Sequence, residues 1–165
     1  MDADTLRAVQ RPLKDAYRED PATAVVTLRA SGAVGAGLTC TVDTGRAIAA
    51  AGLHPATGGD GSSLCSGDML LEALVACAGV TLAAVATALG VELRSATVHA
   101  EGEIDFRGTL GVSRDAPVGF REVRVAFDLD TGADDATVAK LLELTERYCV
   151  VLQTVRAATP VTTSR

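Results

Sequence analysis

The residues best suited to chemistry in this chain are its cysteines. There are four of them: Cys40, Cys65, Cys77 and Cys149. Cys77 lies amid small residues near the middle of the longest apolar, helix-favouring stretch, 67–90, and Cys149 directly follows Glu146-Arg147-Tyr148 at the start of a further helical turn. A cysteine near helix-start amides and a cation has a lowered pKa, whereas one inside an apolar helix needs a polar partner from elsewhere. Spacing alone leaves two interpretations open, a redox pair or two small buried hydrophobes.

The remaining cysteines and the histidines do not form a metal-binding pattern. Cys40 lies in the alternating segment LTCTV and is interpreted as a core residue, while Cys65 lies in a predicted loop and is expected to be exposed and oxidisable. There is no Cys-x-x-Cys motif, and His54 and His99 are isolated in the sequence. We therefore predict no metal and no organic cofactor.

Length and charge narrow the class of protein. A chain of 165 residues fits one domain with its own core, and 15 basic against 21 acidic residues give a net charge of −6 without any basic run. An extended nucleic-acid-binding face is not expected. The N-terminus is too charged for a secretory signal, and Asp68 and Glu72 interrupt the apolar stretch, which makes a membrane span a poor interpretation. We predict a cytoplasmic protein with free or redox-active thiols rather than structural disulfides.

In the first half of the chain, hydrophobic spacing predicts a helix, a hairpin and a second helix. Leu6, Val9, Leu13 and Tyr17 recur at helical spacing in an N-terminal arm that Pro12 is expected to interrupt. Residues 23–30 and 38–45 are predicted strands joined by the Gly-rich link 31–37, and 46–53 fits either a strand or a helical turn. Residues 54–68 are predicted to be loop. The stretch 67–90 is apolar on all sides and is predicted to be a fully buried helix, with Asp68 at its start and Gly90 at its end.

The second half alternates strands and helices. Residues 95–107 and 120–129 are predicted strands joined by a long connection, with Val123, Val125 and Phe127 on one face of the second. Asp134-Asp135 opens a predicted helix that leads to Cys149, a short helix follows, and residues 160–164 are predicted to form a last strand. The order of elements indicates an α+β domain, with neither a Gly-x-Gly-x-x-Gly motif nor a phosphate loop.

Two cysteine-bearing segments carry a resemblance to a known family. Residues 68–77 (DMLLEALVAC) resemble the first-cysteine helix of the OsmC/Ohr family, and residues 144–151 (LTERYCVV) resemble its second-cysteine segment. Residues 101–104 and 117–120 fit the strands between the two segments. The resemblance covers roughly residues 23–163, which divides the chain into an N-terminal helical arm, 1–22, and an OsmC-like domain, 23–165.

The resemblance implies both a fold and an activity. The implied fold is an intertwined homodimer in which antiparallel sheets wrap around two central buried helices. The implied activity is that of an antioxidant thiol peroxidase in the oxidative stress response. The thiolate of Cys77 would attack an organic hydroperoxide to give a sulfenic acid, Cys149 would condense with it to form a disulfide, and a dithiol or lipoyl-bearing protein would reduce that disulfide. An apolar pocket along the central helix would favour fatty or aromatic hydroperoxides.

The resemblance also implies a carboxylate and an arginine near the reactive thiol. Asp68 stands where the family commonly has Glu, Arg29 is the nearest arginine with Arg46 as a rival, and Val150 stands where many relatives have Pro. Asp68 precedes Cys77 by nine residues, a helical rise of about 13 Å at about 1.5 Å per residue, so it cannot touch Cys77 of its own chain. It is expected either to act across a dimer interface or to serve only as a helix cap.

A second class of function stays open at this level. The same fold could use an apolar dimer cavity to bind a small ligand, with cysteines that have no peroxidase role. An arginine paired with Asp68 beside Cys77 would favour catalysis, and the absence of that pair would favour binding.

Overall fold

The computed structural model describes residues 3–35, 39–42, 51–62 and 64–164. The chain divides into two compact units. Unit 1 comprises Met1–Ala30, Thr44–Leu71 and Ala100–Arg124, and unit 2 comprises Ser31–Asp43, Glu72–His99 and Val125–Arg165. The fold is α+β, with mixed helices and antiparallel strands, as the sequence predicts.

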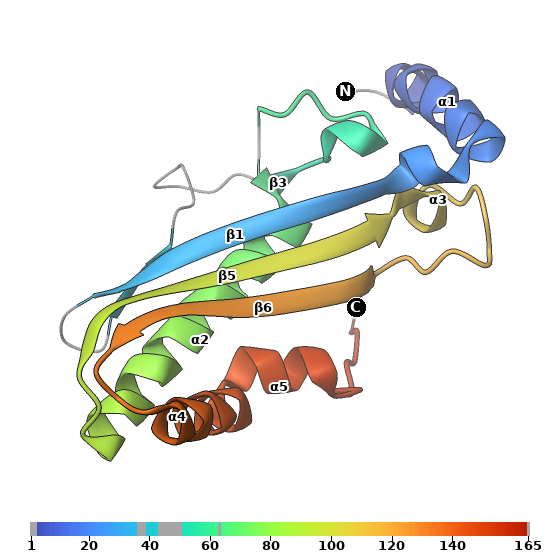
Figure 1. Cartoon of the computed structure of the whole chain (residues 1–165). Helices are drawn as coiled ribbons and strands as arrows, with labels where there is room; N and C mark the ends of the chain where they lie inside the picture. Colours follow the sequence, from blue (N-terminus) through green and yellow to red (C-terminus); the bar gives the residue numbers. More distant parts are fainter. Residues whose placement is uncertain (1–2, 36–38, 43–50, 63, 165) are drawn as a thin grey trace. The chain divides into compact units, whose positions relative to one another are not determined.

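A four-stranded sheet supplies the framework (Figure 1). Its strands are β1 (Val25–Gly35), β2 (Thr39–Val42), β5 (Leu93–Asp105) and β6 (Phe120–Thr131), in the order β2-β1-β5-β6. β1 and β2 pair antiparallel from Gly32 opposite Val42 to Gly35 opposite Thr39. Strand β1 therefore runs through most of the Gly-rich segment predicted to be a link, because its backbone groups find partners in β2.

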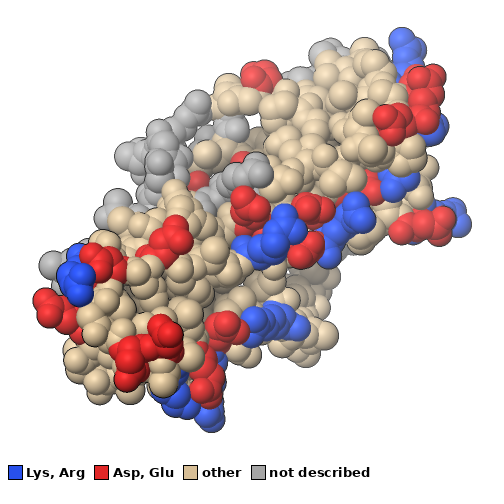
Figure 2. All heavy atoms as spheres, in the orientation of Figure 1, with Lys and Arg blue, Asp and Glu red and all other residues tan. Residues whose placement is uncertain are grey.

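Strand β6 shows the alternation expected of a sheet with one solvated face. Its apolar residues Val123, Val125 and Phe127 are half-buried, whereas the charged residues that alternate with them on the other face, Glu122, Arg124 and Asp128, are exposed. Exposed ion pairs cross from β5 to β6, with Arg94 2.7 Å from Asp130 and Arg124 3.2 Å from Glu103. Figure 2 shows acidic and basic side chains interspersed over one face of the molecule rather than gathered by sign.

The helix α2 (Ser66–Leu89) is the long apolar helix that the sequence predicts. Gly90, at φ 67°, ends it in the left-handed conformation, and the Val91 amide donates to the Ala86 carbonyl at 2.9 Å. Within the single chain the predicted burial on all sides is incomplete, because Leu70, Val80 and Leu89 are each at least 40% exposed. Among the described residues, α2 is the one helix long and apolar enough to cross a membrane, but half of its most apolar window is buried within the protein.

Two further helices, α4 (Asp135–Tyr148) and α5 (Val150–Arg156), meet at Cys149. Asp134 caps α4 as predicted, since its carboxylate accepts a hydrogen bond from the Thr137 amide at 2.8 Å. Cys149 has an extended backbone at φ −71° and ψ 106°, so the chain changes direction there. The core of unit 2 joins α2, β5 and α4 around Leu82, Ala86, Ala96 and Leu141.

Unit 1 contains α1 (Ala3–Glu19), the short helices η1 (Pro21–Ala24), η2 (Pro55–Thr57) and α3 (Phe106–Thr109), and the two-residue parallel strands β3 (Ala51–Gly52) and β4 (Leu64–Cys65). The helix α1 continues through Pro12, contrary to the predicted interruption. The buried Tyr17 donates a hydrogen bond to the Ala56 carbonyl at 2.5 Å, and Gln10 donates to the Thr57 carbonyl at 3.1 Å. The predicted arm thus packs on the η2 segment of the same chain.

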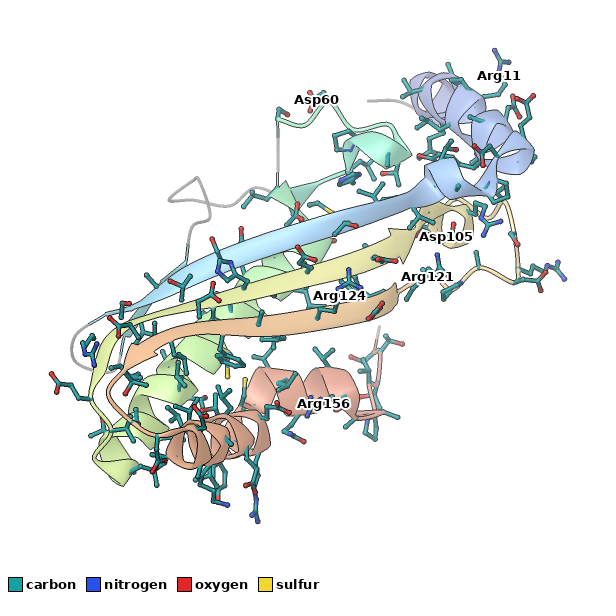
Figure 3. All side chains as sticks on the ribbon, viewed as in Figure 1. Arg11, Asp60, Asp105, Arg121, Arg124 and Arg156 are labelled. Atoms are coloured by element: carbon teal, nitrogen blue, oxygen red, sulfur yellow. The ribbon has the colours of Figure 1, made fainter. Side chains whose placement is uncertain are left out.

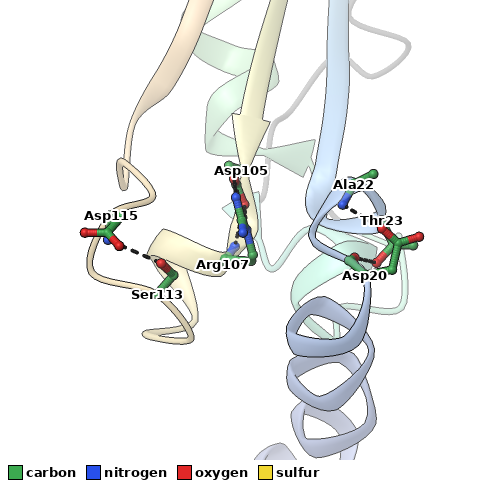
Figure 4. Close-up of polar contacts among 7 residues, drawn as sticks. All are labelled: Asp20, Ala22, Thr23, Asp105, Arg107, Ser113 and Asp115. Carbon is green, nitrogen blue, oxygen red and sulfur yellow. Dashed lines mark hydrogen bonds and ion pairs between the residues drawn. The ribbon is translucent and has the colours of Figure 1, made fainter.

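A buried ion pair lies at the end of β5 in unit 1 (Figure 4). The Asp105 side chain is 2% exposed and the Arg107 side chain 25%, with Arg107 Nε 3.0 Å from Asp105 Oδ1. The Asp105 carboxylate also accepts a hydrogen bond from the Arg107 amide at 3.1 Å and so caps α3. Hydrogen bonds from Arg107, together with its charge and that of Arg121, hold the pKa of Asp105 below its usual range in spite of burial.

Two predictions at the ends of segments differ from the structure. Residues 160–164 form no strand, and they are exposed. The predicted loop 54–68 contains η2 and β4, and α2 already begins at Ser66. The undecided segment 46–53 falls mostly outside the described residues, apart from β3 and Leu53.

Candidate functional site

The structure brings the side chains of Cys77 and Cys149 together in unit 2. Cys77 projects half-buried from the middle of α2, and Cys149 lies fully buried at the junction of α4 and α5. Both thiols are free. The Cys149 thiol donates a hydrogen bond to the Cys77 sulfur, so residues 72 positions apart in sequence share one site.

Neutral groups surround the Cys77 sulfur and stabilise its ionised form. Burial raises the pKa of Cys77, but four donors outweigh it and lower that pKa below its ordinary value. The donors are the Val151 amide, the Cys149 thiol, the Thr81 hydroxyl and the Val150 amide. Hydrogen bonds to the charged form favour ionisation. Cys77 is therefore the better nucleophile of the two at neutral pH.

The pKa of the second thiol, that of Cys149, is shifted in the opposite direction. Burial, together with the nearby Cys77, raises the pKa of Cys149 to about 11, although the Leu152 and Val151 amides act against the rise. The sequence-based interpretation of Cys149 as the cysteine favoured by helix-start amides and a cation is therefore wrong. The amides of Val150 and Val151 favour the thiolate of Cys77, and the exposed Arg147 guanidinium lies over the Tyr148 ring, 5.5 Å from its centroid.

Sequence reasoning missed Thr81 and the amide groups of Val150 and Val151. Thr81 had a detectable signal, because a residue four positions after Cys77 lies beside it on a helix face. The two amides had none, since backbone groups become donors to a distant residue only through tertiary packing. Val150 stands where many relatives have Pro, and only a residue with an N–H group can make this donation.

Asp68 lies in the first turn of α2, within unit 1. Its carboxyl group is half-buried, and burial raises the pKa of Asp68 while the nearby His54 lowers it. His54 in turn accepts a hydrogen bond from the Ala56 amide through Nδ1 at 3.0 Å and stacks on Phe106, with ring centroids 5.0 Å apart. The helix α2 is continuous from Ser66 to Leu89, so Asp68 and Cys77 are separated along one helix, as expected.

Three candidate residues fall outside what the structure describes. Arg29 lies in β1, but its side chain is not among the described atoms, and Arg46 and the Cys40 side chain likewise lie outside the described residues. The fourth cysteine, Cys65, is half-buried in β4 rather than in a loop, and its sulfur accepts a hydrogen bond from the Gly67 amide at 3.4 Å.

The described part of the chain has no group of three His, Cys, Asp or Glu side chains positioned to hold a metal ion. A cavity of about 380 Å³ in unit 2 is lined by both apolar and polar side chains, among them Ala83, Leu93 and Arg94. Cys77 is not part of that lining.

The sequence profile of the OsmC-like protein family matches residues 59–164, a range that includes both Cys77 and Cys149. The chain belongs to the OsmC-like family. No curated protein gives a significant sequence match.

Two crystal structures of OsmC-like proteins share the fold. An OsmC-like hydroperoxide resistance protein from Jannaschia sp. CCS1 superposes with a TM-score of 0.60 at 16% identity, over 84% of this chain and 91% of that one. An OsmC-like protein from Mycoplasma pneumoniae gives a TM-score of 0.57 at 13% identity, over 81% of this chain and 86% of that one. At such identities the similarity establishes the OsmC-like fold, and the activity of this member has to be argued from its own residues.

Proposed function

We propose that this OsmC-like protein is a thiol peroxidase that reduces organic hydroperoxides. The observation that carries the proposal is the pKa difference within the buried thiol pair, with Cys77 lowered and Cys149 raised to about 11. A peroxidase of this kind needs one thiolate to attack the peroxide and one protonated thiol to resolve the product. The pair supplies both in hydrogen-bonding contact.

The proposed cycle begins at the Cys77 sulfur. Its thiolate attacks one peroxide oxygen, the O–O bond breaks, and the departing alkoxide takes up a proton to become an alcohol. The resulting Cys77 sulfenic acid condenses with the Cys149 thiol, which forms a disulfide and releases water. A dithiol, free or carried by a lipoyl-bearing protein, then returns two electrons and two protons.

The setting of Cys77 favours hydroperoxides with an organic substituent. Its neighbours on α2 are Ala73, Ala76 and Val80, which are small or apolar. Burial of each methylene of a substrate against such a surface is favourable by about 0.8 kcal/mol, a gain that hydrogen peroxide cannot make.

We also propose that the working form is a homodimer. Ala73, Val80 and Ala84 are exposed on α2 at the three- and four-residue spacing that also includes Cys77. A second copy of the chain would cover this apolar face and would bring Asp68 and Arg29 toward the reacting thiol of its partner. Burial raises the pKa of Asp68. A nearby guanidinium would lower that pKa and so favour the ionised carboxylate.

Thiol stoichiometry with one equivalent of cumene hydroperoxide tests the activity. Wild type is expected to lose two thiols, Cys149→Ser one, and Cys77→Ser none, with Cys65→Ser as a matched control that behaves as wild type. In steady-state assays with a dithiol, Cys77→Ser is expected to lose at least about a thousandfold in turnover, as is typical when a nucleophile is removed.

The same assay separates this function from small-molecule binding. A binding protein with the OsmC-like fold would make no use of the pKa difference between the thiols. Equal peroxide consumption by wild type and Cys77→Ser, or none by wild type, would exclude the peroxidase.

A further inference from the structure

The resolving thiol is the less accessible member of the pair. Cys149 has no exposed surface, whereas Cys77 is half-buried. Cys149 occupies the single non-helical position between Tyr148, where α4 ends, and Val150, where α5 begins. Any external thiol that approaches the Cys149 sulfur must therefore displace one of the elements packed around it.

Disulfide chemistry nevertheless directs the reductant to that buried sulfur. In thiol–disulfide exchange the sulfur with the lower pKa is the better leaving group, and the attacked sulfur is its partner. Cys77 has the lowered pKa and Cys149 the raised one. Reduction by way of the better leaving group therefore requires that Cys149 become accessible.

The helix α5 is held against the rest of unit 2 by few contacts. Of its seven residues, only Leu152 is buried and only Val151 half-buried. Arg156 lies 2.9 Å from the Glu146 carboxylate of α4, and the Gln153 side-chain amide donates to the Glu146 carbonyl at 2.7 Å. Arg156 is labelled on α5 in Figure 3.

The angle between α4 and α5 contains a shallow groove beside these polar contacts. The groove has a volume of about 590 Å³, and Leu142, Glu146, Gln153 and Arg156 are among its lining residues. The polar contacts to Glu146 connect the two helices beside this groove. An exposed ion pair of this kind is weak enough to open on the timescale of turnover.

We propose that Glu146, Arg156 and Gln153 form a latch that holds α5 closed over Cys149, and that α5 must open before a dithiol can reduce the enzyme. This inference rests on the proposed peroxidase cycle. Glu146, Arg156 and Gln153 are positioning residues, because they act through α5 and do not touch the reacting sulfur atoms.

The closed position of α5 favours the peroxide half of the cycle, and the open position favours the reductive half. When α5 is closed, the amides of Val150 and Val151 donate to Cys77 and favour its thiolate. When α5 is open, one thiolate of the dithiol attacks the Cys149 sulfur, the Cys77–Cys149 bond breaks, and Cys77 leaves as a thiolate. The second thiol of the reductant then displaces Cys149 from the mixed disulfide. The reductant ends as a disulfide, and its two protons go to the protein thiols.

Two measurements on Arg156→Ala test the latch without use of a peroxide. Diamide first converts the reduced protein to the Cys77–Cys149 disulfide, and the return of thiols is then followed after mixing with dihydrolipoamide. The expected rate is about two- to fivefold above wild type, the factor by which loss of an exposed ion pair raises an open population. In the reduced protein, ultraviolet thiolate absorbance against pH is expected to show a higher pKa for Cys77.

Two further variants distinguish the latch from a general change in stability. Arg156→Lys keeps a cation opposite Glu146 and is expected to restore both readouts toward wild type. Lys140→Ala removes another exposed ion pair of α4, in which Lys140 lies 2.9 Å from Glu143, and is expected to leave both unchanged.

The latch is overturned if Arg156→Ala is reduced at the wild-type rate or more slowly. It is also overturned if the pKa of Cys77 does not rise in that variant. An acid-quenched mixed disulfide with 2-mercaptoethanol that maps to Cys77 rather than Cys149 also overturns it. If cumene hydroperoxide fails to oxidise wild type, the proposed peroxidase function is lost, but the diamide experiment still decides whether α5 controls access to Cys149.

Discussion

Asp105 and Cys77 both have a lowered pKa, and the shift has a different cause in each. Asp105 in unit 1 is 2% exposed and is neutralised by the guanidinium of Arg107. Cys77 in unit 2 is half-buried, and the groups that favour its anion are two amides, a hydroxyl and a thiol. One anion is paired with a cation, and the other is surrounded by dipoles.

The difference explains why only one of the two sites is suited to chemistry. A carboxylate whose oxygens accept hydrogen bonds from a guanidinium has its lone pairs engaged and its charge balanced, so it stabilises structure. Neutral donors favour a thiolate without cancelling its charge, and the sulfur keeps the electron density that attack on a peroxide requires. The predictions below test each half of this contrast.

The largest effect is expected from Asp105→Asn. The substitution preserves shape but leaves Arg107 without its countercharge, and it is expected to lower the free energy of unfolding by about 2–3 kcal/mol. This is less than the about 3–5 kcal/mol for fully buried pairs, because Arg107 is 25% exposed. Chemical denaturation at neutral pH measures the change, and an unaltered midpoint would contradict a stabilising role.

The same pair has a predictable pH dependence. The folded-state pKa of Asp105 is lowered, so its contribution to stability is fully present above its unfolded-state pKa of about 3.9 and is lost as the pH falls through the folded-state value. Wild type is expected to lose stability below about pH 4 more steeply than Asp105→Asn does. Parallel acid titrations of the two proteins would count against the assignment.

A smaller effect is expected from Thr81→Val, which removes one neutral donor from Cys77. A hydrogen bond to a charged group is worth about 1.5–3 kcal/mol when buried, and the half-buried site lowers this, so the thiolate population at neutral pH is expected to fall about five- to tenfold. Thr81→Ser keeps the hydroxyl and is the matched control. Thiolate absorbance against pH is the measurement, with Cys77→Ser as the blank.

The smallest effect is expected from Val150→Pro, which removes the last of the four donors. Proline fits the first position of α5, and Cys149 before it already has the extended backbone that a following proline requires. The pKa of Cys77 is therefore expected to rise without loss of the helix, and by less than in Thr81→Val. A pKa shift larger than that of Thr81→Val would show that the contact with α5 had been lost as a whole.

The sequence was sufficient where local chemistry decides the structure. Asp134 and Gly90 mark helix ends through side-chain and backbone properties of their own, and the alternation of Val123, Val125 and Phe127 follows from a sheet with one solvated face. The helix carrying Cys77 could be predicted almost to its ends, and so could the family resemblance of the two cysteine segments.

The sequence was insufficient where a distant segment decides the outcome. Gly32 and Gly35 belong to a strand because β2 pairs with them, whereas residues 160–164 pair with none of the described strands. The acidities of Cys77 and Cys149 depend on which sulfur the amides of α5 reach and how deeply each is buried. Neither quantity can be derived from the spacing of the residues.

The donors around Cys77 also make the site responsive to its own oxidation. The amide groups of Val150 and Val151 have an anion to solvate only while Cys77 is reduced. In the proposed cycle, formation of the disulfide removes that charge and leaves two backbone donors without their acceptor, a condition that folded proteins avoid. In the proposed cycle, oxidation therefore removes two contacts of α5 at the moment when the reductant has to enter.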